Sequence, residues 1–151
     1  METITITISQ SDVYNEVAKA TDYTGSKLID GDENARNRIL AVDDDFKELG
    51  RFWDESVTAV NEDLKEMLVS GATDVDKNYK AELQVSKSWD NTLQESVQSS
   101  LRSFFIASIT AQWFRFANKG EAKEYFSTAG EIMLNVERLL YARKRPMLPT
   151  D

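Results

Sequence analysis

The sequence predicts a mainly α fold, a bundle of four to five helices with a small antiparallel β element. Long segments carry apolar residues at intervals of three and four, which is the spacing of one helix face. Two short segments, residues 2–9 and 79–86, instead alternate apolar and polar residues as half-buried strands do. We expect residues 1–145 to form one helical domain and residues 146–151 an extended tail, because its two prolines oppose helix formation.

The first predicted strand lies in the sequence ETITITIS, where Ile4, Ile6 and Ile8 alternate with threonines. A single strand leaves its backbone N–H and C=O groups unpaired, so this segment needs a partner. Residues 79–86, with the sequence YKAELQVS, alternate in the same way and are the partner we expect. The pairing lies either within one subunit or between neighbouring subunits.

The first helix is predicted to begin after Ser9 or Ser11, either of which can cap it, and to be interrupted at Gly25. The acidic segment that follows alternates Asp and Asn like a calcium loop. It lacks the glycine and the closing glutamate of that loop, so we interpret residues 30–34 as a solvated loop.

The second helix is predicted to begin at Asp43–Asp45, whose charges suit the positive end of the helix dipole. Its apolar spacing continues to Met67, and Ser70 and Gly71 are expected to end it. The helix then has roughly 25 residues. A loop over residues 72–78 separates it from the second strand.

Asp90 is expected to cap the third helix, which carries the most apolar stripe of the chain. Gly120 is expected to end that helix, and a fourth helix follows at once, so the two are predicted to form an antiparallel hairpin. Trp113 and Phe116 continue the apolar stripe. Phe114 falls off it and is a candidate for a contact between subunits.

Composition excludes several kinds of chemistry. The 151 residues include no histidine and no cysteine, which removes Ser-His-Asp and Cys-His catalysis and the imidazole and thiolate metal ligands. No nucleotide-binding glycine motif is present. We therefore expect no enzyme, no cofactor and no metal. A carboxylate-dependent hydrolase is the one enzyme class that stays open, and no motif supports it.

Charge and hydropathy bear on partners. The 26 acidic and 18 basic residues give a net charge of −8, which opposes nonspecific attraction to nucleic acid. The longest apolar run, FFIASIT, is far shorter than the ~20 residues of a membrane span, and the first residues lack the pattern of a signal peptide. We expect no membrane contact.

A basic cluster, Arg143, Lys144 and Arg145, precedes Pro146 and contrasts with the acidic chain. Two interpretations stay open. Cations complement the negative end of a helix dipole, and the cluster is also suited to bind an acidic protein surface or a phosphate backbone.

The last third of the chain, from SLRSFF to YARKRP, resembles small helical proteins encoded beside capsid and portal genes in tailed phages and prophages. The shared features are an aromatic helix ending in a Trp-Phe pair, a break, an EA..Y helix start and a final LLYARKRP. The segments EVAKATDYTGSKL and RFWDESV are similar to the same group, so the resemblance covers most of the chain.

The resemblance implies a head-to-tail connector, also called an adaptor or neck-ring protein, that is not an enzyme. It implies a ring homo-oligomer, a dodecamer, that binds the portal protein and tail or neck proteins and encloses passing DNA. The protein would then reside in the virion, and in the host cytoplasm during assembly. The alternative is a soluble helical adaptor or regulator that binds a protein partner through the same surfaces.

The residues expected to contact the portal, the tail or a neighbouring subunit come from three segments, the first strand, the aromatic helix and the basic end. They are Ile4, Ile6, Ile8, Phe114, Arg143, Lys144, Arg145 and Pro146.

Overall fold

The computed structural model describes residues 2–27, 46–117 and 119–144. Within these residues the chain forms four α-helices and one three-stranded antiparallel sheet, which confirms the predicted mainly α fold with a small β element. The elements in chain order are β1 (Glu2–Ile8), α1 (Gln10–Lys27), α3 (Phe46–Asp63), β2 (Leu68–Thr73), β3 (Tyr79–Val85), the 3₁₀ helix η2 (Asn91–Leu93), α4 (Gln94–Ala117) and α5 (Lys119–Tyr141).

The first strand pairs with the predicted partner inside the same chain. β1 and β3 are antiparallel, with Ile4 opposite Leu83 and Ile8 opposite Tyr79. The three isoleucines face the core and the threonines between them are exposed. Alternation at period two therefore places every apolar residue of both strands on one buried face.

A third strand, β2, occupies the place where the sequence pattern predicted the end of a helix. α3 ends at Asp63 and a turn follows, so the predicted helix end at Ser70 and Gly71 is wrong, and both residues lie in β2. The pattern misled because Leu64 and Met67 keep helical spacing although they pack against the core from the turn. Pairing of β2 with the second edge of β3 satisfies backbone groups that a longer helix would have left open.

Two predicted helix ends also differ in the structure. α1 continues through Gly25 to Lys27, and Gly120 lies in the first turn of α5 instead of ending α4. A glycine inside a helix costs only ~1 kcal/mol, so it does not by itself end the helix. Two predicted helix starts agree with the structure. Ser9 Oγ accepts a hydrogen bond from the Asp12 N–H at the start of α1. Asp90 caps η2, which leads directly into α4.

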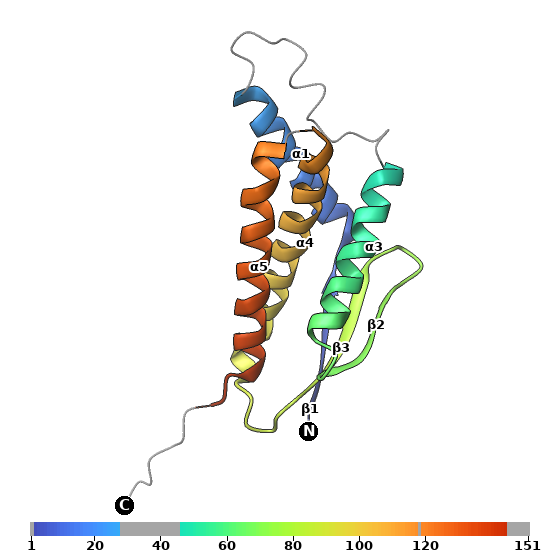
Figure 1. Cartoon of the computed structure of the whole chain (residues 1–151). Coiled ribbons are helices and arrows are strands. Elements are labelled where there is room, and N and C mark those ends of the chain that lie inside the picture. Colours follow the sequence, from blue (N-terminus) through green and yellow to red (C-terminus); the bar gives the residue numbers. More distant parts are fainter. Residues whose placement is uncertain (1, 28–45, 118, 145–151) are drawn as a thin grey trace, which may run out of the picture.

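α4 is the central helix of the molecule. It packs against α1, α3, α5 and β1, and it forms the predicted antiparallel hairpin with α5 (Figure 1). An aromatic cluster joins these layers, since the Phe105 ring lies 4.6 Å from Trp53 of α3 and 5.4 Å from Tyr79 of β3. Figure 1 also shows that β1 begins at the end of the molecule where α5 terminates.

Candidate functional site

The basic end of the chain is held against the body of the protein. We call residues 142–144 the tail root. The N–H of Lys144 donates to the carbonyl of Ser88 (2.7 Å), and the N–H of Asp90 donates to the carbonyl of Ala142 (3.3 Å). These bonds form a short antiparallel bridge in which Arg143 lies opposite Trp89. The side chains of Arg143 and Lys144 are exposed on this fixed backbone.

A buried tryptophan secures the tail root. Trp89 is 1% exposed, and its indole Nε1–H donates to the carbonyl of Leu139 at 2.9 Å. The last carbonyls of a helix lack partners within the helix, so this bond caps α5. The sequence offered one signal for it, a tryptophan standing alone in the polar stretch SKSWDN, but its partner is 50 residues away.

Beside the tail root, the surface has two adjoining hollows of about 200 and 270 Å³. Both are lined by Glu66, Met67 and Tyr141, so we call them together the Tyr141 hollow. Arg143 lines the larger one, and Glu137 lines the smaller one. The Tyr141 side chain is 61% exposed, so the hollow presents an aromatic surface beside a cation.

The structure places the isoleucine candidates away from any partner. Ile4, Ile6 and Ile8 are 8%, 0% and 2% exposed, because the sheet turns them onto the helices. These three side chains are therefore not on the surface of this chain, and a contact of the strand with a neighbouring subunit stays a prediction. The outward side of β1 consists of its exposed threonines and, because β1 is an edge strand, of one row of its backbone groups.

Side-chain amides from α4 cover part of that backbone edge. Gln98 Oε1 accepts a hydrogen bond from the Thr7 N–H (3.3 Å), and Gln94 Nε2 donates to the Thr5 carbonyl (3.2 Å). Gln94 and Gln98 are four residues apart and therefore lie on one helix face. An edge strand whose polar groups are already bonded is a poorer template for a strand from another chain.

Phe114, the other apolar candidate for a subunit contact, is also buried in this chain. It is 0% exposed and packs with Ala122 and Tyr125 of α5, with the Phe114 and Tyr125 ring centroids 5.3 Å apart. The apolar stripe of α4 predicted one buried face. The return of α5 beside α4 covers a second face, and this could not be read from the spacing within α4 alone.

Of the eight candidate residues, the structure leaves Arg143 and Lys144 exposed and close together at the tail root. Arg145 and Pro146 lie outside the described residues. The segments at residues 30–34 and 43–45, considered above as a metal loop and a helix start, also lie outside them.

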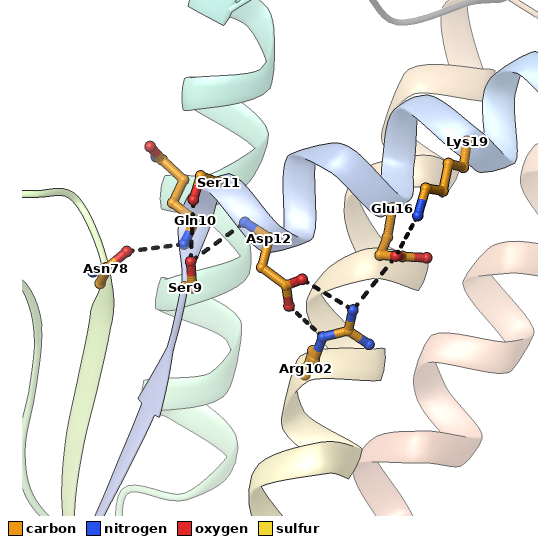
Figure 2. Close-up of polar contacts among 8 residues, drawn as sticks. All are labelled: Ser9, Gln10, Ser11, Asp12, Glu16, Lys19, Asn78 and Arg102. Carbon is orange, nitrogen blue, oxygen red and sulfur yellow. Dashed lines mark hydrogen bonds and ion pairs between the residues drawn. The ribbon is translucent and has the colours of Figure 1, made fainter.

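A polar cluster joins α1 to α4 (Figure 2). Arg102 binds both carboxylate oxygens of Asp12 through Nε and Nη2, and Nη2 also lies 3.7 Å from Glu16. The hydrogen bonds from Arg102 hold the pKa of Asp12 below its usual value of 3.8. Lys19 completes the row with an ion pair to Glu16 at 3.3 Å. Every charge in this cluster has an opposite partner, so we interpret it as a tie between the two helices.

The other displaced pKa values have structural causes as well. Burial raises the pKa of Tyr79 to about 12, and its hydroxyl donates to Asn61 Oδ1 at 2.6 Å. Burial, with the charge of Asp54, raises the pKa of Tyr14 to about 12. In the described part of the chain no three acidic side chains come together as metal ligands, and no described helix has the length and apolar character of a membrane span.

No known family model, no curated protein and no solved structure matches the chain.

Proposed function

We propose that the protein is a non-catalytic structural subunit of a virion, a head-to-tail connector that oligomerises and joins the portal to the tail. The proposal starts from the resemblance of the sequence to such proteins, above all in its last third, which ends in LLYARKRP. The observation that supports it best is the tail root. Two exposed cations are fixed beside the Tyr141 hollow, where the chain continues into its last residues.

A fixed cationic surface suits assembly better than a mobile one. Binding through a segment that is already ordered loses less conformational entropy, so more of the contact energy appears as affinity. Arginine at such a position forms bidentate hydrogen bonds with carboxylates and phosphates. The aromatic ring of Tyr141 next to it supplies the apolar contact area typical of interface centres.

The direct test is assembly of the purified protein, alone and with portal protein, followed by native mass spectrometry and negative-stain microscopy. We expect ring oligomers that bind the portal. A protein that stays monomeric and never joins a portal particle would contradict the proposal. A monomer that instead binds a different protein through the tail root would favour the adaptor alternative.

Truncation tests the tail root itself. Deleting residues 143–151 should impair assembly and leave helicity by circular dichroism unchanged, because the deleted residues follow α5. Deleting residues 145–151 is the matched control, since it keeps Arg143 and Lys144. Unchanged assembly after the longer deletion would remove the tail root from the proposal.

Charge reversal separates specific from general electrostatic effects. Arg143→Glu with Lys144→Glu should weaken assembly. Lys80→Glu with Lys123→Glu changes the net charge equally at other exposed positions and should have a much smaller effect. Equal losses in the two double variants would indicate net charge alone.

A further inference from the structure

The tip of the β2–β3 hairpin presents an apolar side chain fully to solvent. Val75 is 95% exposed, the highest exposure among the large hydrophobic residues described. The turn around it is ordered, because Asp74 Oδ1 accepts hydrogen bonds from the N–H groups of Asp76 (2.9 Å) and Asn78 (3.0 Å). We call residues 74–77 the hairpin tip.

The base of the same hairpin is fastened to the body of the protein. Asn78 Oδ1 accepts a hydrogen bond from the Gln10 N–H at 3.1 Å, which joins the end of the turn to the start of α1 (Figure 2). Asp74 and Asn78 also pair through their backbones at 2.9 Å. The backbone that carries Val75 is thus ordered before any partner arrives, which lowers the entropy cost of binding through it.

The chain itself carries a surface that matches the hairpin tip. The larger part of the Tyr141 hollow offers about 270 Å³ beside Met67 and Tyr141, room for one branched aliphatic side chain. Its rim carries a cation, Arg143, and an anion, Glu66. On the hairpin tip, Asp74 precedes Val75, and Asp76 and Lys77 follow it directly. Two pairs of opposite charge are therefore available beside the apolar contact, Asp76 with Arg143 and Lys77 with Glu66.

The two surfaces cannot meet within one molecule. Met67 precedes the first residue of β2 and the hairpin tip follows the last, so the six extended residues of β2 hold them about 20 Å apart. A second copy must supply the partner surface. Because the two contacting surfaces differ, each copy keeps one of each free, and the contact repeats into a closed ring or an open filament.

We propose that the hairpin tip of one copy docks into the Tyr141 hollow of the next, with Val75 against Met67 and Tyr141 and with Asp76 opposite Arg143. This contact rests on the self-assembly proposed above and names the surfaces that would make it.

The absence of cysteine from the sequence allows a direct cross-linking test. Val75→Cys and Tyr141→Cys proteins, mixed under assembly conditions and mildly oxidised, should give a disulfide-linked dimer that neither protein gives alone. Leu134→Cys replaces Tyr141→Cys in the control, because Leu134 is 67% exposed on the same helix. Equal yields with Tyr141→Cys and Leu134→Cys would overturn the proposal. A Leu134→Cys protein that cross-links to itself would point to a contact between α5 helices instead.

Charge exchange gives a second test that does not depend on cysteine. Asp76→Arg and Arg143→Asp should each weaken self-association about five-fold in sedimentation velocity, and the chain with both changes should recover it. Rings that form normally with either single change, and without the cross-link, would overturn the contact but leave the connector proposal standing. A chain that is monomeric at every concentration, with and without portal, would overturn both.

Discussion

Arg102 links two helices that lie far apart in the sequence. Its guanidinium binds both oxygens of Asp12 on α1, and Glu16 lies one helical turn further along. The side chains of Arg102 and Asp12 are 38% and 47% exposed, so water and salt screen much of their attraction. The contact stabilises the pair of helices mainly through its two hydrogen bonds and only a little through burial of charge.

We predict that Asp12→Asn, which weakens this contact, lowers the free energy of unfolding by less than about 1 kcal/mol at neutral pH. Because Arg102 lowers the folded-state pKa of Asp12, the contribution is complete above the unfolded-state value of 3.8 and is lost as the pH falls through the folded-state pKa. Urea denaturation at pH 7 and at about pH 3 should show the difference shrinking at acid pH. Lys19→Gln, at the exposed end of the row, is the control and should change little. A difference that persists fully in acid would indicate another cause.

The three-stranded sheet has two edges, and amide side chains from helices bond to both. Gln94 and Gln98 cover the β1 edge, as described above. On β2, Asn61 of α3 donates through Nδ2 to the Gly71 carbonyl at 3.0 Å. Tyr79 fixes the same amide from its other side by donating to Oδ1. Helix side chains thus occupy some of the outward backbone groups at both edges of the sheet, which makes these edges poorer templates for another strand.

The Asn61 bridge needs a glycine beside it. A Cβ on residue 71 would lie 2.2 Å from Asn61 Oδ1 and 2.9 Å from the Tyr79 hydroxyl, so Gly71→Ala should destabilise the protein by about 1–3 kcal/mol. Gly130→Ala is the matched control, because a Cβ there has no neighbour within 4 Å and helix propensity predicts a gain of up to about 1 kcal/mol. Thermal denaturation measures both. A Gly71→Ala variant as stable as the parent would mean that Asn61 moves aside freely.

The tail root depends on the loop between β3 and η2, which carries Trp89. Trp89→Phe keeps an aromatic ring but removes the donor to the Leu139 carbonyl, so stability should fall by about 1–3 kcal/mol. The backbone N–H of Lys144 should then exchange faster with solvent, because its bond to Ser88 relies on the same loop. Hydrogen exchange monitored by NMR would show this. If the Lys144 amide is equally protected from exchange in the parent and in Trp89→Phe, the tail root does not depend on the Trp89 hydrogen bond.

α4 is the element on which α1, α3, α5 and β1 pack. Residues 107–112 are all buried, including the polar residues Ser108, Thr110 and Gln112. Ser108 and Ser56 of α3 are 2.9 Å apart and share a buried hydrogen bond, which fixes how the two helices face each other. A helix covered all round is the centre of a core.

Removing the ring at that centre should therefore weaken the entire fold. Phe105→Ala deletes a side chain that is 0% exposed and touches both Trp53 and Tyr79, and we expect a loss of about 3–5 kcal/mol. Phe126→Ala, at 37% exposure on α5, should cost about 1 kcal/mol. Chemical denaturation followed by circular dichroism compares the two. Similar losses would mean that the core is not organised around Phe105.

The spacing of apolar residues predicted the elements that have one solvent-exposed face and one buried face. β1, β3, the amphipathic part of α3 and the α4–α5 hairpin follow from it, and so does the pairing of β1 with β3. It failed at β2, whose residues Leu68–Thr73 are partly or fully exposed and carry no alternation of their own. β2 is stabilised by pairing with the second edge of β3. The pattern of its own six residues does not indicate that pairing.

The candidate site, too, is predictable from the sequence only in part. The available chemistry can be read from the sequence, since the chain has no histidine or cysteine and places consecutive cations just after its last predominantly helical segment. Which candidates are accessible depends on the packing of the fold. Phe114 is buried under α5, the isoleucines are buried under the helices, and Arg143 is fixed beside the Tyr141 hollow through Trp89. Composition and spacing are local properties, whereas the burial of a residue depends on the segment that packs against it.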